Sequence, residues 1–111
     1  MELDKKEFGR FGEQTATEYY RRAGYHVLAT NYRCKAGEID LVVSRGRELV
    51  FVEVKSRRDD SYGKPAEAVG PKKMHHLRQT AACYLKQHRC LAEEVRFDII
   101  EITLGHIKGV G

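Results

Sequence analysis

The sequence lacks any long apolar run, and this absence excludes whole classes of protein. No stretch approaches the roughly 20 apolar residues that a membrane-spanning helix needs. The charged first ten residues, MELDKKEFGR, are not followed by the apolar stretch of a secretory signal. Both absences predict a cytoplasmic protein with no membrane partner.

Cysteine is also scarce, and the three cysteines form no closely spaced pair. They are Cys34, Cys83 and Cys90. An odd number at wide spacing favours reduced thiols over a disulfide framework. A structural zinc site would need tight pairs such as C-x-x-C, so we interpret the cysteines and the histidines of residues 75–88 as ordinary polar positions.

The composition that remains is typical of one globular domain spanning residues 1–111. Hydrophobic residues make up 41% of the 111 residues and charged residues 32%, which distinguishes the chain from a disordered segment. The net charge of +4 allows a polyanionic partner but does not require one.

Residues 37–57 predict a β-hairpin around which the chain is organised. Two apolar runs, at 39–43 and 49–54, flank a polar segment that contains Gly46. Side chains alternate along a strand, so Phe51, Glu53 and Lys55 share one face while the valines between them share the other. An acid and a lysine beside an apolar sheet are costly to bury unless they pair or bind something.

Periodicity and turn residues predict the remaining elements. A helix, three strands, a second helix and a final strand are expected at 8–23, 25–32, 38–44, 48–56, 71–89 and 94–104, with a short turn at 66–69 and an edge strand at 105–108. The adjacent Ile99 and Ile100 predict that both faces of the last long strand are covered, as in an interior strand. The order predicts an α/β fold with a central mixed sheet flanked by helices.

The hairpin register decides whether a third charge, Asp40, joins Glu53. Directly opposed residues of an antiparallel pair point to the same face. A four-residue loop at 45–48 would place Asp40 opposite Glu53, and a two-residue loop would place it opposite Phe51. A three-residue loop would turn Asp40 to the other face. A shared site therefore requires an even-length loop or a compensating bulge.

Two carboxylates on adjacent strands suit a hard cation such as Mg²⁺, which binds one or two carboxylates and keeps several waters. Asp40 and Glu53 are the candidate ligands, with the carbonyl of Val54 as a third oxygen and Glu38 as a further acid. Lys55 would then position the attacking water or stabilise a pentacovalent phosphate. The alternative is a plain salt bridge between Lys55 and one of the acids.

The motif GEID followed by FVEVKSR resembles the PD-(D/E)xK nuclease signature, with Asp40, Glu53 and Lys55 in its key places and Ile39 where the literal proline would stand. Over roughly residues 8–104 the chain resembles the bacterial YraN-like family, which is similar in fold to archaeal Holliday junction resolvases. The resemblance implies a restriction-endonuclease-like fold. It also implies a metal-site role for Glu13, which the sequence alone favours as a solvated acid of the first helix.

The resemblance implies an endonuclease that depends on Mg²⁺ or Mn²⁺ and acts on DNA, including branched or junction DNA, with a homodimer expected by analogy. The expected phosphate contacts are Arg45, Arg47, Arg57, Arg58, Lys64, Lys72 and Lys73. Two alternatives stay open: a non-catalytic nucleic-acid-binding or interaction module on a nuclease scaffold, and a structural adaptor whose acids only pair with Lys55.

Overall fold

The computed structural model describes residues 5–57, 70–88 and 92–103. Its elements are α1 (Lys5–Arg22), β1 (His26–Cys34), β2 (Gly37–Arg45), β3 (Glu48–Arg57), α2 (Pro71–Gln87) and β4 (Glu94–Thr103). Every helix and strand predicted within these residues is present, with ends shifted by at most three residues. The predicted turn at 66–69 and the edge strand at 105–108 lie outside the described residues.

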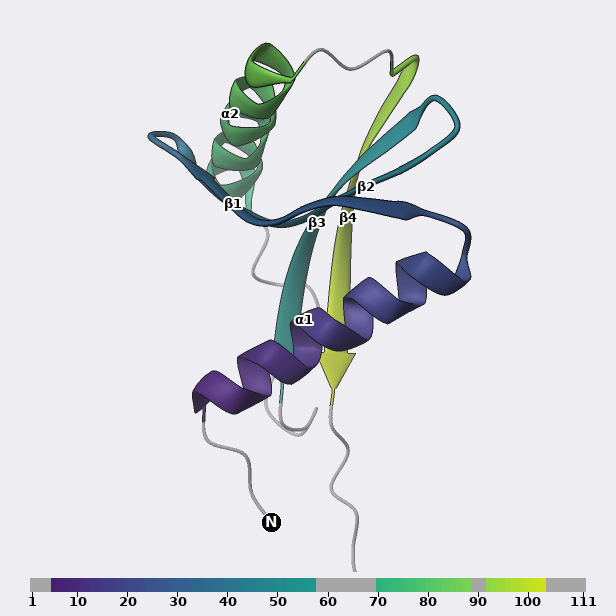
Figure 1. Cartoon of the computed structure of the whole chain (residues 1–111). Helices are drawn as coiled ribbons and strands as arrows, with labels where there is room; N and C mark the ends of the chain where they lie inside the picture. Colours follow the sequence, from purple (N-terminus) through teal and green to yellow (C-terminus); the bar gives the residue numbers. More distant parts are fainter. Residues whose placement is uncertain (1–4, 58–69, 89–91, 104–111) are drawn as a thin grey trace, which may run out of the picture.

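The four strands form one mixed sheet in the order β1-β2-β3-β4. The first two pairs are antiparallel and β3 pairs with β4 in parallel, with α2 between them in the chain (Figure 1). A parallel pair requires a crossover of this kind, whereas a tight turn suffices for the antiparallel pairs. The mixed sheet with its flanking helices confirms the predicted α/β class and is consistent with a restriction-endonuclease-like fold.

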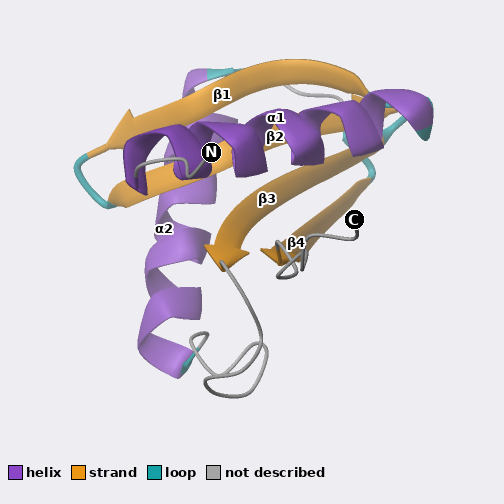
Figure 2. Ribbon diagram, turned by 90° about the horizontal axis from the view of Figure 1, so that it is seen from below, coloured by secondary structure: helices purple, strands orange, loops and turns teal. Residues whose placement is uncertain are grey.

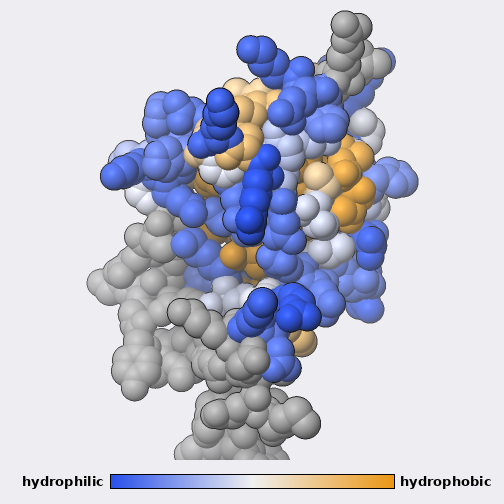
Figure 3. Space-filling model, turned by 60° about the vertical axis from the view of Figure 1, so that its left-hand side comes forward, coloured by the Kyte–Doolittle hydropathy of each residue, from blue (hydrophilic) through white to orange (hydrophobic). Residues whose placement is uncertain are grey.

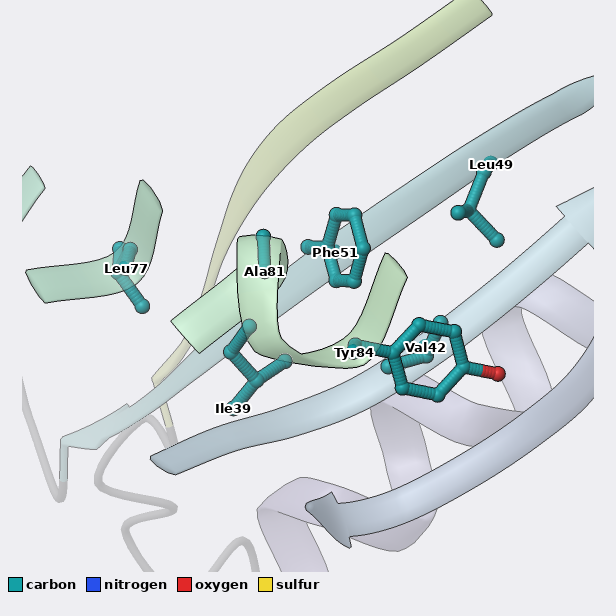
Figure 4. Close-up of a cluster of buried hydrophobic side chains, with 7 residues drawn as sticks. All are labelled: Ile39, Val42, Leu49, Phe51, Leu77, Ala81 and Tyr84. Carbon is teal, nitrogen blue, oxygen red and sulfur yellow. The ribbon is translucent and has the colours of Figure 1, made fainter. Parts of the chain in front are cut away.

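The two helices cover opposite faces of the sheet (Figure 2). On the α1 side, Tyr20 packs among the even-numbered valines of β3 and the side chains of Leu41 and Val43. Figure 4 shows the cluster on the α2 side, formed by Ile39, Val42, Leu49, Phe51, Leu77, Ala81 and Tyr84. Side chains alternate along β3, so Glu53 lies on the α2 side, as Leu49 and Phe51 do. None of the described helices is long and apolar enough to cross a membrane.

The β2–β3 hairpin closes through only two residues, Gly46 and Arg47, because Arg45 pairs with Glu48. Gly46 has a φ of 61°, a conformation that glycine adopts without steric cost in tight hairpin turns. The register is nevertheless the one predicted for a longer loop, since it aligns position 40 with position 53. The prediction that a two-residue loop would align Asp40 with Phe51 is wrong, because the strands extend one pair further than expected.

The prediction of an interior position for the last strand is also wrong among the described strands. β4 pairs only with β3 and lies at the edge of the sheet. Ile99 packs against the α2-side cluster and Ile100 against the α1-side cluster. The adjacent pair Ile99 and Ile100 thus indicates that both faces of the sheet are covered at β4. The pair does not indicate whether β4 has a hydrogen-bonded strand on each side.

Asp98 ties α1 to β4. It accepts a 2.6 Å hydrogen bond from the Tyr20 hydroxyl, and Arg96 donates to both of its carboxylate oxygens. Arg96 also contacts Glu48 at 3.0 Å. These contacts give Asp98 a structural role, and they fix the helix that carries Glu13.

Candidate functional site

The candidate site lies where β2 and β3 separate. Their pairing ends at Leu41 and Val52, whereas β3 continues beside β4 to Arg57. Past this point the carboxylate of Asp40 accepts a 2.7 Å hydrogen bond from the Val54 N–H. Because the N–H and C=O of one strand residue face the same neighbour, the Val54 carbonyl is directed toward the same gap. The Asp40 carboxylate and the Val54 carbonyl oxygen are thus both directed into the gap between β2 and β3.

A local irregularity in β2 sets the position of Asp40. Ile39 and Val42 both pack on the α2 side while Leu41 packs on the α1 side, so the strict alternation breaks at residue 40. Opposite Asp40 in β1, Asn31 adopts a φ of 51°, which asparagine tolerates better than most residues. The break allows Asp40 to line clefts on both sides of the sheet.

Glu53 is the second carboxylate of the site. Its side chain is only 12% exposed, and it lines the α2 cleft together with Asp40. Burial, followed by the interaction with Glu53, raises the pKa of Asp40 to about 7, although the Val54 N–H opposes the shift. Two carboxyl groups held together in this way create a place that favours a cation.

Two clefts meet at Asp40. The α2 cleft, of about 180 Å³, lies between the carboxylates and the first turns of α2, and it is lined by Glu38, Asp40, Glu53, Lys73 and His76 among others. The α1 cleft, of about 360 Å³, lies between α1 and the sheet, and its lining includes Arg10, Glu13, Gln14, Thr17, Arg21, Asn31, Asp40 and Val54.

Glu13 reaches the site because α1 crosses β3 closely at Gly12. A β-carbon at Gly12 would lie 1.9 Å from the Ser56 hydroxyl oxygen and 3.2 Å from its Cβ. Glu13 lies 3.5 Å from the Asn31 amide nitrogen and contributes to the raised pKa of Asp40 after burial and Glu53. The structure therefore brings Glu13 to the same cleft as Asp40, and its metal-site role stays a prediction.

Glu38 belongs to the lining of the α2 cleft, whereas Lys55 is not among the lining residues of either cleft. Glu38 is exposed, lines the α2 cleft, and pairs with Arg33 at 3.5 Å. Lys55 is half-buried and follows Glu53 on β3. Among the described residues, the lysine that pairs with Glu53 is Lys73 of α2, at 3.1 Å.

Among the predicted basic residues whose side chains the structure describes, the two arginines of the hairpin turn lie apart from the two lysines of α2. Arg45 and Arg47 lie at the hairpin turn, five residues or more from Asp40 and roughly 16 Å away at strand spacing. Arg45 donates to the Ala23 carbonyl and lies over the Tyr25 ring, and Arg47 pairs with Glu93.

The other basic residues divide between the first turn of α2 and parts of the chain without described side chains. Lys72 is exposed and Lys73 contacts Glu53. The side chain of Arg57 and all of Arg58 and Lys64 lie outside what the structure describes. Near the candidate site, the described members of the predicted phosphate-binding set are therefore the two lysines of α2.

The sequence reasoning missed the polar lining of the α1 cleft. The missed members on α1 are Arg10, Gln14, Thr17 and Arg21, which recur with Glu13 on one face of the helix at spacings of three and four residues. A polar stripe with that spacing around Glu13 would have indicated them. Nothing in the local sequence marks Asn31, whose role depends on the strand opposite.

The donor set at Asp40 fits a hard divalent cation without forming a complete cage. Within residues 5–57, 70–88 and 92–103, no three histidine, cysteine or acidic side chains are grouped so that they could hold a metal ion. Mg²⁺ commonly uses one or two carboxylates and retains water, and the fully buried Oε2 of Glu53 has no hydrogen-bond donor among the described residues. A pair of carboxylates with an unsatisfied buried oxygen matches that requirement.

Comparison with known proteins places the chain in a family. The model of the "Uncharacterised protein family UPF0102" matches residues 12–102. A UPF0102 protein of Syntrophus aciditrophicus is 46% identical over 96 residues, which cover 86% of this chain and 76% of that protein. The region that the family model matches contains every candidate ligand, from Glu13 to Val54.

Two further relatives cover more of both chains. A UPF0102 protein of Caldicellulosiruptor saccharolyticus is 38% identical over 102 residues, covering 92% of this chain and 86% of its own. A UPF0102 protein of Mycolicibacterium vanbaalenii is 40% identical over 114 aligned positions, covering 96% and 94%. The similarity therefore extends over nearly the whole chain.

Proposed function

This chain belongs to the UPF0102 family, and we propose that it is a metal-dependent endonuclease that hydrolyses phosphodiester bonds of DNA, including branched or junction DNA. The observation that carries the proposal is the meeting of the Asp40 and Glu53 carboxylates beside Val54, where β2 and β3 separate. A cytoplasmic location and a homodimer that acts on two strands belong to the same proposal.

The chemistry is divided among a few residues. Asp40, Glu53 and the Val54 carbonyl would hold Mg²⁺ or Mn²⁺, with Glu13 or Glu38 as a further oxygen donor from one cleft or the other. The ion would supply charge neutralisation at the phosphoryl oxygens and a more acidic water. Lys55, about 6–7 Å from Glu53 along the strand, orients the attacking water or stabilises the charge on the pentacovalent phosphate.

The surface suits a polar substrate. The face in Figure 3 is mainly hydrophilic, with hydrophobic patches that are separate from one another. The α2 cleft has Lys73 and His76 on the wall opposite the carboxylates. A phosphodiester between these walls would meet the cation on one side and basic groups on the other, so DNA binding should weaken steeply as salt rises.

The test is cleavage of duplex, flap and four-way DNA with Mg²⁺, with Mn²⁺ and with EDTA. We expect metal-dependent cleavage by the wild type and none by Asp40→Ala. Glu93→Gln is the matched control, because this acid pairs with Arg47 at the far end of the hairpin. Equal cleavage by wild type and Asp40→Ala would remove the site assignment.

A second candidate, a nucleic-acid-binding module without catalysis, is favoured by two observations. No complete set of three metal-binding side chains is present among the described residues, and Lys73 already provides Glu53 with a positive charge. This candidate predicts DNA binding without cleavage, no effect of Mg²⁺ on that binding, and full binding by Glu53→Gln.

A further inference from the structure

Lys73 makes an unusual contact with Glu53. Its Nζ lies 3.1 Å from Oε2 of Glu53, whose side chain is 12% exposed while that of Lys73 is 45% exposed. The two groups are not aligned for a hydrogen bond, since Oε2 is fully buried and without a donor among the described residues. The ammonium therefore compensates the charge of Glu53 without satisfying its hydrogen-bonding capacity.

The position of Lys73 in α2 makes this contact more informative. The helix begins at Pro71 after Gly70, which provides no side-chain cap, and its first turn contains no acidic residue. A cation in the first turn is opposed by the helix dipole. Glu53, which lies across the α2 cleft, offsets that cost, so the placement of Lys73 depends on an acid of the sheet and not on its own helix.

One ammonium group faces several carboxylates. Asp40 and Glu38 line the same cleft as Glu53, and Glu13 approaches Asp40 from the α1 cleft. Glu38 has Arg33 as a partner. The carboxyl groups of Asp40 and Glu53 thus share one ammonium, and a divalent cation in its place would balance both as carboxylates.

We propose that Lys73 is the counter-ion of Glu53 in the metal-free protein, that a divalent cation displaces it from this carboxylate, and that the released ammonium then binds a phosphate in the α2 cleft. This inference rests on the proposed function, because it concerns the same metal site. It adds an order of events, in which cation binding precedes and strengthens nucleic-acid binding.

The geometry of lysine supports both positions. A divalent ion bound to Oε2 would repel an ammonium group 3.1 Å from the same atom. The flexible four-carbon stem and partial exposure of Lys73 allow the ammonium to move without moving the helix. His76 lies on the same wall of the cleft and would face a phosphate bound there beside Lys73.

The inference is tested by titrating the full chain with Mn²⁺ alone, by calorimetry, in the wild type, Lys73→Met and Lys72→Met. Lys72 is exposed and adjacent in the same helical turn, so its replacement reports the general effect of removing one positive charge. We expect Lys73→Met to bind Mn²⁺ about fivefold more tightly than Lys72→Met, because it has no ammonium to displace. Thermal unfolding with and without Mn²⁺ confirms that each variant is folded, and Lys73→Gln replaces Lys73→Met if the latter is not.

DNA binding provides the second measurement. Mn²⁺ should increase the affinity of the wild type for a four-way junction at least severalfold more than it increases the affinity of Lys73→Met, because only the wild type has an ammonium that the ion releases toward the phosphate. DNA should increase the affinity for Mn²⁺ by the same factor, since coupling between two ligands is reciprocal. Equal Mn²⁺ affinity in the two lysine variants would overturn the inference while leaving the metal site intact. Absence of Mn²⁺ binding in every variant would overturn both the inference and the proposed function.

Discussion

The backbone amide of Val54 donates a 2.7 Å hydrogen bond to the carboxylate of Asp40, at the point where β2 and β3 cease to pair. The side chain of one strand thus takes the hydrogen bond that the backbone of a regular ladder would accept. This contact holds Asp40 in the gap between the strands, where both clefts meet. The acidic site is therefore built from an interruption of the sheet.

The first prediction concerns the stability cost of Asp40. Burial and the neighbouring Glu53 raise its pKa to about 7, so between about pH 4 and pH 7 the folded state binds more protons than the unfolded state. Stability contributed by this group is then lost as pH rises through that window. Asp40→Asn keeps an acceptor for Val54 and should be more stable than wild type at pH 8 in EDTA, by about 1–2 kcal/mol after allowing for solvent screening.

Urea unfolding at pH 5 and pH 8 measures this difference, and Asp98→Asn is the control of opposite sign. Burial raises the pKa of Asp98, but hydrogen bonds from Arg96 and Tyr20 outweigh burial and lower it overall. Stability from Asp98 is therefore present above its ordinary pKa and lost in acid, so Asp98→Asn should destabilise the protein at pH 8. A wild-type pH dependence in Asp40→Asn would contradict the first prediction.

Sequence patterns were sufficient for the helices and strands, and they named Asp40 and Glu53 as neighbouring acids. Periodicity located both helices and all four described strands, and alternation placed Glu53 beside the apolar core of the α2 side. The break at Asp40 could not be predicted, because it depends on Asn31 in the strand opposite. The pairing of Lys73 with Glu53 also escaped prediction, because it joins elements that only the tertiary fold brings together.

The second prediction separates the roles of Lys55 and Asp40. Under the proposed function Lys55 acts on water or phosphate and is not a ligand of the cation, so Lys55→Met should lower the cleavage rate at saturating DNA by about 100-fold or more. Its affinity for Mn²⁺ should stay within about twofold of wild type. Asp40→Ala should lose both cleavage and Mn²⁺ binding. Loss of Mn²⁺ binding in Lys55→Met would show that this lysine has a structural role at the site.

The third prediction uses two glycines of α1 as a matched pair. Glycine to alanine in a helix normally stabilises by about 0.5–1 kcal/mol, and Gly9 has open space for a β-carbon. At Gly12 the β-carbon would lie 1.9 Å from the Ser56 hydroxyl oxygen, so Gly12→Ala should instead destabilise by about 1–3 kcal/mol.

Urea unfolding of both glycine variants, alone and combined with Ser56→Gly, provides the measurement. Ser56→Gly removes the side chain that the new β-carbon meets, so it should restore most of the stability lost in Gly12→Ala. Equal stability of Gly9→Ala and Gly12→Ala would contradict a close crossing of α1 over β3. The same crossing brings Glu13 to Asp40, so Gly12→Ala should also weaken Mn²⁺ binding if Glu13 is a ligand.

The fourth prediction concerns the two cysteines that the fold brings together although they lie far apart in sequence. A hydrogen bond from the Cys83 thiol lowers the pKa of Cys34, with further help from the amides of the following turn, whereas the pKa of Cys83 is raised. A lower pKa means more thiolate at neutral pH.

In a Cys90→Ser background, iodoacetamide at pH 7 should therefore modify Cys34 roughly two- to fivefold faster than Cys83, as measured by peptide mass spectrometry. Cys83→Ser retains a hydroxyl donor and should preserve the reactivity of Cys34, while Cys83→Ala should reduce it. Faster modification of Cys83 than of Cys34 would show that the hydrogen bond runs in the other direction.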